Sequence, residues 1–276
     1  MRKDKQNRGS WRYHVFLIGA VIILGTPLYY AMMMSTQSLG ETLANPLAPG
    51  QSFAENLERV IASRLHITFA NSVAASLTIA LGKTALSLLA GLAFSFFRFR
   101  GKWFAFAAIL FTLMMPGEVL VIALFRVVSV TLGLGNSFAG LVLPSLASAA
   151  GTFLFRQHFE SIPSELSEAA QMDGMNPLQY LAYVLIPLSW NTIVALFVIS
   201  FLVGWNLYLW PLMIITDPAS QVVQVGLSFI TQSEGLAAQN LGPLMLGAVI
   251  SSIPPLIVFM VFQKHFMRGF AISREK

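Results

Sequence analysis

The sequence predicts an all-α integral membrane protein with six transmembrane helices. Of its 276 residues, 56% are hydrophobic and only 11% are charged, and the mean hydropathy is +0.70. Soluble globular domains usually carry about one quarter charged residues. The apolar stretches are also long enough to cross a bilayer as helices, which takes about 20 residues each. We therefore expect residues 1–276 to form a single transmembrane domain.

Polar and basic segments divide the chain into six expected spans, all within residues 14–262. The first span, at 14–34, follows a basic tail at 1–12. We expect it to be retained, because it is as long as a span and no small-residue cleavage site closes it. A polar external loop at 35–67 contains a short amphipathic helix near 53–65. The later spans are expected at about 68–97, 103–125, 137–155, 188–214 and 241–262, before a basic tail at 263–276.

Lys and Arg residues indicate how these spans are oriented. With six spans both tails lie on one side of the membrane, and 13 of the 17 Lys and Arg residues fall on that side. Because basic residues accumulate in cytoplasmic segments, we expect both termini and residues 161–187 to be cytoplasmic. The basic residues flank the spans and form no single patch, so we expect membrane lipid and no nucleic acid as a partner.

The stretch at 161–187 is polar although apolar spans flank it. Pro163 suits the first turn of a helix, and Gly174 is placed as a C-terminal cap that can adopt a positive φ. The sequence NPLQ at 176–179 has the N-cap, the proline and the N3 glutamine of a second helix start. The first helix is too short to be stable alone, so it needs support from the spans and from a partner.

The spacing in this stretch resembles a family signature. EAA at 168–170, Gly174 and VLIP at 184–187 are similar to the EAA signature of permease subunits in bacterial ATP-driven (ABC) importers. The family has Ile and Leu where this chain has Val184 and Ile186, which are conservative changes. The resemblance implies a type I ABC importer permease fold in which residues 161–187, hereafter the EAA loop, form a cytoplasmic coupling helix. The ATPase-coupling residues that it implies are Glu168, Ala169, Ala170, Asp173, Gly174 and Pro187.

The resemblance covers nearly the full length. The six spans, the long external loop, the basic turn after the second span and GWNLYLWPL at 204–212 are similar to second permease subunits of maltose-type carbohydrate importers. Within that family, FLFRQHFESIPSELSEAAQMDG and RGFAISREK are most similar to subunits that import sn-glycerol 3-phosphate. The resemblance implies import of this compound or related glycerophosphodiesters across the bacterial cytoplasmic (inner) membrane. A sugar or oligosaccharide remains an alternative substrate.

The family also implies partners and a source of energy. The expected partners are a second, homologous permease subunit, two copies of an ATPase subunit and an extracytoplasmic substrate-binding protein. This chain has no G-x-x-x-x-G-K-[ST] phosphate loop, no metal-spaced His or Cys cluster and no Ser/His/Asp constellation. We therefore expect no enzyme activity and no cofactor bound by this chain, with ATP and Mg used by the partner ATPase.

Ionisable residues within the spans are candidates for the transport pathway. Lys83 lies near the middle of the second span, and Glu118 and Arg126 lie in or just beyond the third. Such residues cost at least roughly 2.5 to 3.5 kcal/mol each to insert, so they tend to face a partner or a wet cavity. Lys83 and Glu118 could instead form a structural ion pair, and Arg126 could anchor at the outer headgroups. An ion-coupled secondary transporter would use the same residues, but the sequence shows no internal repeat.

An aromatic and polar cluster in the fifth span is a second candidate. At helical spacing, Trp205 and Tyr208 share one face at i, i+3, and Asn206 and Trp210 share another at i, i+4. The cluster could stack against and hydrogen-bond a polyol or sugar, with Asn206 as donor and acceptor. An interfacial aromatic belt explains the same residues equally well.

Overall fold

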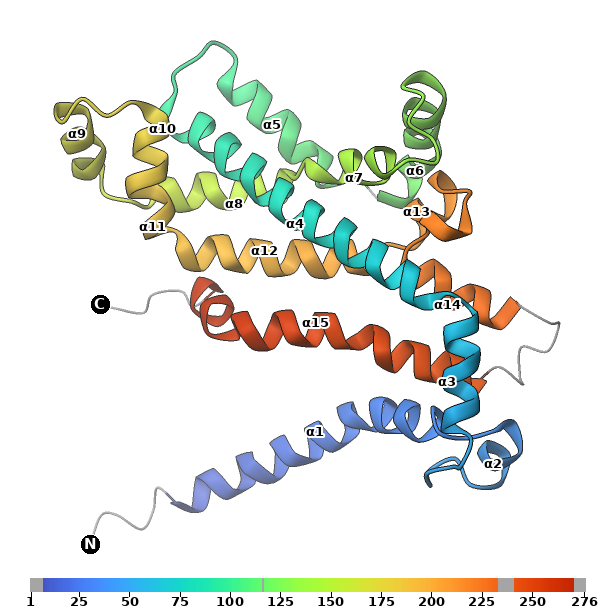
Figure 1. Ribbon diagram of the computed structural model, residues 1–276. Coiled ribbons are helices and arrows are strands. Elements are labelled where there is room, and N and C mark those ends of the chain that lie inside the picture. The colour runs from blue at the N-terminus through green and yellow to red at the C-terminus, as the bar shows by residue number, and fades with distance from the viewer. Residues whose placement is uncertain (1–6, 116, 233–240, 271–276) are drawn as a thin grey trace, which may run out of the picture. The chain divides into compact units, whose positions relative to one another are not determined.

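The computed structural model describes residues 7–115, 117–232 and 241–270, where the chain is helical and contains no strand (Figure 1). In chain order its α-helices are α1 (Asn7–Met34), α2 (Leu39–Ala44), α3 (Phe53–Ala62), α4 (Leu65–Phe96), α5 (Lys102–Thr112), α6 (Gly117–Phe125), α7 (Phe138–Leu146), α8 (Ala149–Glu160), α9 (Ser164–Met172), α10 (Pro177–Tyr180), α11 (Ile186–Leu188), α12 (Trp190–Trp205), α13 (Leu209–Ile214), α14 (Val223–Gln232) and α15 (Leu241–Phe270). Two π-helical turns and one 3-10 turn complete them, namely η1 (Arg126–Thr131), η2 (Leu181–Leu185) and η3 (Pro218–Ser220).

Four helical stretches of the described residues are long and apolar enough to cross a membrane. They are Tyr13–Met34, Leu65–Phe96, Phe138–Glu160 and Leu241–Met267, which match the first, second, fourth and sixth expected spans. A fifth candidate is bent, because Pro177–Leu188 and Trp190–Trp205 meet at 84°. The prediction of an all-α membrane protein is therefore confirmed, although the third, fourth and fifth expected spans each comprise more than one helix.

The third expected span, 103–125, is interrupted. α5 ends at Thr112, a turn follows at 113–115, and α6 begins at Gly117. Pro116 lies outside the described residues, but its place in the sequence accounts for the interruption, because the residue before a proline is disfavoured in the helical region. This expected span therefore comprises two helices.

The fifth expected span, 188–214, is also interrupted. α12 ends at Trp205, and α13 begins at Leu209 after three non-helical residues. Pro211 accounts for the break, because a proline ring excludes the carbonyl four residues earlier from a helical position and the residue has no N–H to donate. The two helical faces expected here are therefore absent, namely Trp205 with Tyr208 and Asn206 with Trp210.

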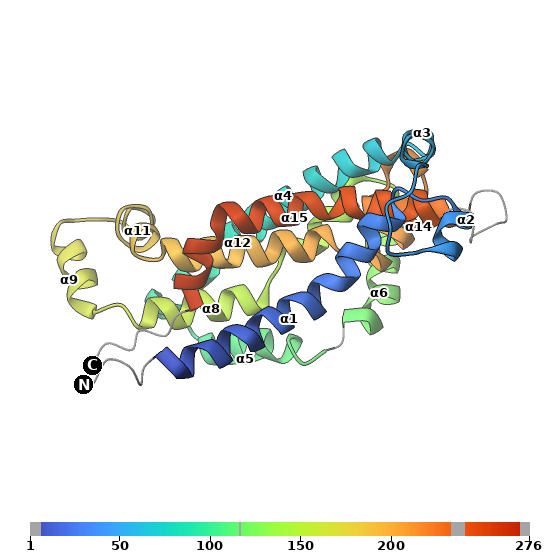
Figure 2. The ribbon, with the colours of Figure 1, turned by 90° about the horizontal axis from the view of Figure 1, so that it is seen from below.

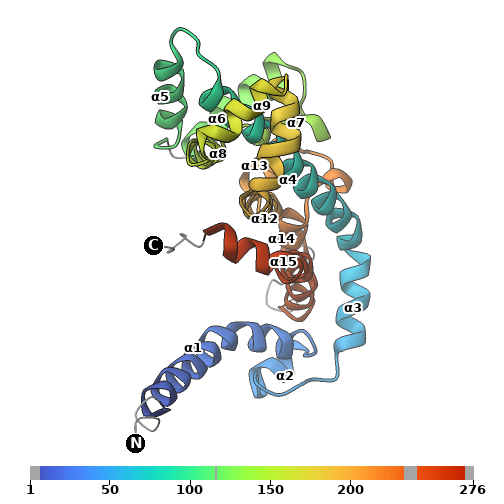
Figure 3. The same cartoon turned by 90° about the vertical axis from the view of Figure 1, so that its left-hand side faces the viewer.

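The chain folds into two compact units. Unit one is Met1–His66 with Gly226–Ile253, and unit two is Ile67–Val225 with Pro254–Lys276. Within unit two, α4, α8 and α12 run lengthwise, and α9, α10 and α11 lie beyond one of their ends (Figure 1, Figure 2). A third view shows α8 and α12 nearly end on (Figure 3).

Glycines allow α4 and α8 to approach closely in unit two. A Cβ added to Gly91 of α4 would lie 2.5 Å from the Cβ of Phe155, and one added to Gly151 of α8 would lie 2.2 Å from the Oγ of Ser87. Small residues serve this purpose in membrane helix pairs, where van der Waals packing is a main source of attraction. The crossing leaves Phe155 fully buried.

Two apolar clusters fill unit two. One surrounds Trp210, whose Nε1 donates a hydrogen bond to the carbonyl of Leu141 at 3.1 Å. The other contains Phe155 and Leu185, both 0% exposed, and includes Ala170 of α9. The second cluster therefore connects the EAA loop to α4, α8 and α12.

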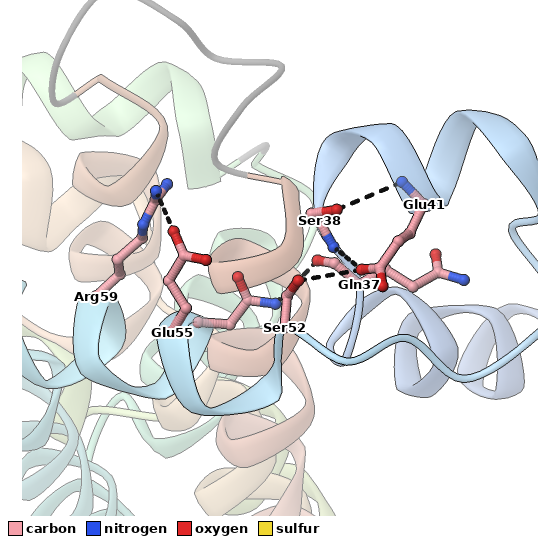
Figure 4. A network of polar contacts seen from close by, with 7 residues as sticks. Gln37, Ser38, Glu41, Ser52, Glu55 and Arg59 are labelled. Atoms are coloured by element: carbon pink, nitrogen blue, oxygen red, sulfur yellow. Dashed lines mark hydrogen bonds and ion pairs between the residues drawn. The ribbon is translucent and has the colours of Figure 1, made fainter.

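A polar network shapes the external loop in unit one. Buried Asn56 donates from its Nδ2 to the carbonyls of Ser35 and Gln37, both at 3.0 Å. The Oε2 of Glu41 accepts from the amide of Ser38 at 2.7 Å and from the Oγ of Ser52 at 3.1 Å (Figure 4). These bonds fix a loop that the sequence analysis described only as polar with one amphipathic helix.

The Glu41 carboxylate joins α2 to the start of α3. Its Oε1 accepts from the amide of Gln51 at 3.1 Å, and with Ser38 it forms a capping box at the start of α2. Hydrogen bonds from the amides of Ser38 and Gln51 lower the pKa of Glu41 below its ordinary value of 4.5. A carboxyl whose pKa is lowered by folding stabilises the folded loop most when it is ionised.

We expect Glu41→Gln to loosen the external loop. The side chain of glutamine is uncharged and has one acceptor oxygen, so it cannot replace the carboxylate that accepts from Ser38, Gln51 and Ser52. Hydrogen–deuterium exchange should show faster amide exchange across residues 38–52. In the unchanged protein the same loop should lose protection below pH 4.5, as Glu41 becomes protonated through its lowered pKa. The control is Glu58→Gln, which removes an exposed carboxylate from α3. Equal exchange in the two variants would contradict this role for Glu41.

Candidate functional site

α9 carries the EAA sequence and starts one residue later than expected. Pro163 occupies the N-cap position with an extended ψ of 134°, rather than the first turn. The fixed φ of proline suits either position, and the location of helix ends is ambiguous by a residue or two. The boundary shifts without changing which residues α9 contains from Glu165 onward.

The C-terminal end of α9 is closed as the sequence predicts. The amide of Met175 donates to the carbonyl of Ala170 and the amide of Gly174 to that of Gln171, each at 3.0 Å. This pair of bonds is a Schellman motif, which needs a left-handed residue at Gly174, and its φ is +74°. A Cβ added there would meet nothing within 4 Å, so backbone conformation rather than space selects glycine.

The second helix of the EAA loop has the predicted start. The Oδ1 of Asn176 accepts from the amide of Gln179, and the Oε1 of Gln179 accepts from the amide of Asn176, both at 2.9 Å. Pro177 stands at the first helical position. This capping box fixes the direction of α10 relative to the turn at Gly174.

A π-helical turn leads from α10 to Pro187. The amide of Ile186 bonds to the carbonyl of Leu181, five residues earlier. In a regular α-helix the ring of Pro187 would clash with the carbonyl four residues back, so the wider turn accommodates it. The chain then bends at Ser189 and enters α12. Pro187 therefore lies where the EAA loop meets a membrane helix.

One face of α9 packs against the rest of unit two. Ala170, 6% exposed, is the one buried residue of α9, all of whose residues are described. It belongs to the cluster that contains Phe155 and Leu185. A cavity of about 250 Å³ lies beside it, and its lining includes Phe96, Phe97, Ser167, Gln171, Met175 and Tyr180.

The other face of α9 is exposed and acidic. Glu168, Ala169 and Asp173 are exposed, and the side chain of Met172 is 83% exposed. Within the described ranges neither carboxylate has an ion-pair partner. This face of α9 therefore presents two carboxylates and one apolar side chain to its surroundings.

The ionisable candidates are not brought together by the described structure. Lys83 lies in α4, is partly exposed and forms no ion pair with any residue that the structure describes. Arg126 begins η1 and is exposed. The side chain of Glu118 lies outside the described residues, so its pairing with Lys83 stays a prediction.

Trp205 is a core residue at the end of α12. Its side chain is 1% exposed, and its ring lies edge-on to Phe69 at 5.5 Å and stacked on Phe201 at 5.9 Å between centroids. It therefore supports the break between α12 and α13 from inside. The two exposed residues of the cluster are Asn206 and Tyr208, which is 44% exposed.

Gln224 joins this site, although the sequence analysis missed it. Its Nε2 donates to the Oδ1 of Asn206 at 3.4 Å, and the Nδ2 of Asn206 donates to the carbonyl of Leu202 at 2.8 Å. Gln224 lies on α14, 18 positions along the chain, and no local pattern places it near Asn206. Asn206, Tyr208 and Gln224 together present amide and hydroxyl groups beside an interrupted span.

Comparison with protein families matches residues 83–272 to the binding-protein-dependent transport system inner membrane component family. Three relatives are each named sn-glycerol-3-phosphate transport system permease protein UgpE. Those of Brucella melitensis, Rhizobium meliloti and Escherichia coli O1:K1 are 37%, 38% and 37% identical over 274, 273 and 272 residues. Each alignment covers 95% of this chain and 96% of the relative.

The fold has a solved counterpart. The structure is similar to a chain in the crystal structure of a bacterial ABC transporter involved in the import of the acidic polysaccharide alginate, with a TM-score of 0.81. The two chains are 24% identical, and the match covers 96% of this chain and 99% of the other. This likeness confirms the predicted ABC importer permease fold over nearly the whole length.

We expect Gly174→Ala to loosen the end of α9 and Gly174→Asn to disturb it less. A left-handed alanine costs about 1–2 kcal/mol, whereas asparagine adopts this conformation more readily. Hydrogen–deuterium exchange should show amides near Met175 exchanging about tenfold faster in Gly174→Ala. This factor corresponds to a loss of about 1.4 kcal/mol in the free energy of local opening. The same exchange rate in all three proteins would show that the positive φ does not hold this turn.

Proposed function

This chain belongs to the family of binding-protein-dependent transport system inner membrane components, and we propose that its substrate is sn-glycerol 3-phosphate or a related glycerophosphodiester. The chain is a multi-pass permease subunit of an ABC importer in the inner membrane. The observation that carries the substrate proposal is 37–38% identity over 95% of the chain to three UgpE permeases. The chain forms half of the translocation pathway.

The other half of the pathway comes from a second, homologous permease subunit. Two copies of an ATPase subunit hydrolyse ATP with Mg, and an extracytoplasmic binding protein delivers the substrate. This chain catalyses no reaction and binds no cofactor. The 13 basic residues on one side of the predicted topology support cytoplasmic termini and a cytoplasmic EAA loop.

The EAA loop couples the ATPase to the membrane helices. The exposed face of α9 docks in the ATPase, with Glu168 and Asp173 offering charge and Met172 offering an apolar contact. Ala170 and the closed turn at Gly174 tie α9 to the cluster shared with α8 and α4. When the ATPase dimer closes, the loop therefore transmits the displacement of the ATPase to the membrane helices. The translocation pathway then changes from inward-facing to outward-facing.

The substrate-facing side of the chain lies at the interrupted fifth span. Asn206, Tyr208 and Gln224 can donate to and accept from the hydroxyl groups of a glycerol moiety. Lys83 and Arg126 are the cations of the spans that can attract its phosphate. Trp205 acts from the core by holding the end of α12.

ATP hydrolysis tests the substrate. In the reconstituted complex with its binding protein, we expect sn-glycerol 3-phosphate to stimulate hydrolysis and maltose to leave it at the basal rate. The binding protein selects the ligand, and only a loaded binding protein favours closure of the ATPase dimer. Stimulation by maltose alone, or by neither compound, would remove the glycerophosphate proposal and keep the importer family.

The same assay locates the membrane site. We expect Asn206→Ala to change the dependence of stimulated hydrolysis on sn-glycerol 3-phosphate without lowering basal hydrolysis. The control is Gln263→Ala, which removes an exposed side-chain amide from α15. If hydrolysis by Asn206→Ala depends on sn-glycerol 3-phosphate as in the unchanged protein, Asn206 does not contact the substrate and belongs to an interfacial aromatic belt.

A charge reversal tests coupling. We expect Glu168→Lys to lower uptake while the complex still assembles and hydrolyses ATP. The substitution reverses a charge on the face of α9 that is proposed to bind the ATPase, and so weakens that contact. The comparison is Glu165→Lys, which makes the same change in the first turn of α9, where a carboxylate also stabilises the helix N-terminus. If the charge reversal acts by destabilising α9, uptake should fall further in Glu165→Lys. If it acts by removing the contact with the ATPase, uptake should fall further in Glu168→Lys. Normal uptake in Glu168→Lys would contradict the coupling role.

A further inference from the structure

A polar contact joins the end of α15 to the start of α12. The Nδ1 of His265 lies 3.0 Å from the Oδ1 of Asn191, and both side chains are partly buried. Asn191 is the second residue of α12, directly after the 84° bend that ends the EAA loop. His265 therefore contacts the chain where the EAA loop becomes a membrane helix.

The rest of this contact between α12 and α15 includes an aromatic pair. Phe197 and Phe262 meet edge to face with their ring centroids 5.8 Å apart. Apolar contacts of this kind allow helices to slide, whereas a hydrogen bond between two side chains fixes one register. The pair of His265 and Asn191 thus sets how the two helices are aligned at this end.

We propose that His265 and Asn191 act as a tie that makes the C-terminal half of α15 move with the EAA loop. This proposal rests on the coupling role proposed above. The hydroxyl of Ser189, at the bend itself, is buried and has no hydrogen-bond partner among the described residues, so it cannot serve this purpose. Both residues are positioning residues, because they are remote from the exposed face of α9.

Two prolines allow half of α15 to follow that movement. α15 passes from unit one to unit two at Pro254 and Pro255. Each proline removes a hydrogen bond from the helix interior, which is where helices bend. The half that contains His265 can therefore be displaced while the helix bends at these prolines.

Alanine variants test the tie in the assembled complex. We expect Asn191→Ala and His265→Ala to reduce uptake per ATP hydrolysed by about fivefold or more, a typical coupling effect. The double variant should be no worse than either single one, and Asn191→His combined with His265→Asn should restore coupling. The control is Gln263→Ala, because Gln263 is exposed and its side chain bonds within its own helix, to the carbonyl of Met260. Wild-type coupling in both single variants would overturn the proposal.

A removable covalent link provides a test that does not depend on loss of function. The chain has no cysteine, so Asn191→Cys with His265→Cys introduces a single pair of thiols that a bifunctional reagent can cross-link. We expect coupling to be low in the free thiol form, to recover with a short bifunctional methanethiosulfonate bridge and to fall again on reduction. Uptake is normalised to inserted protein, and single-cysteine variants control for partner thiols. A bridged protein that couples no better than the unbridged one would overturn the tie.

The coupling role and the tie fail in different ways. If Glu168→Lys uncouples transport and the tie variants do not, only the tie is wrong. If neither Glu168→Lys nor the tie variants alter uptake per ATP, the coupling role of the EAA loop is wrong as well.

Discussion

Burial of Ala170 is the contact on which the EAA loop depends. α9 has nine residues, whereas an isolated helix of fewer than about 12 residues is marginal in water. Its stability must therefore come from contacts outside the helix, and Ala170 is the residue of α9 that reaches the apolar cluster with Phe155 and Leu185. A small side chain is suited to this place, because it brings the backbone of α9 close to the cluster and leaves the opposite face free for a partner.

Local chemistry made the turn between the two helices of the EAA loop predictable. A glycine cap and an N-cap box depend on residues within five positions of one another, so the sequence identifies them directly. The left-handed Gly174 and the reciprocal bonds of Asn176 and Gln179 confirm both predictions. The apolar stretches likewise located four spans, because hydropathy reports the composition of a segment. Hydropathy does not report whether the helix is continuous, so it located the third and fifth spans without the ends of the helices within them.

Contacts between distant positions could not be predicted from local patterns. Phe69, on another helix, lies edge-on to the buried ring of Trp205, and nothing near Trp205 in the sequence indicates this contact. Gln224 reaches Asn206 from α14, and His265 reaches Asn191 across 74 positions. Each of these side chains is ordinary in its own segment, and its role appears only when the helices are packed.

Two interruptions bound α12. At one end Pro187 and Ser189 form the bend into the EAA loop, and at the other the chain leaves the helix at Asn206. Side-chain amides satisfy backbone carbonyls on either side of α13, since the Nδ2 of Asn206 donates to the carbonyl of Leu202 at 2.8 Å and the Nε2 of Gln221 donates to that of Ile215 at 2.6 Å. Broken spans are tolerated in a bilayer where neighbouring groups satisfy the freed backbone in this way. Between its ends α12 has 16 residues, nine of them buried, and a length of about 24 Å. A helix that is packed along its length moves as a rod, so the proposed coupling loop and the proposed substrate contact at Asn206 lie at the two ends of one rigid element.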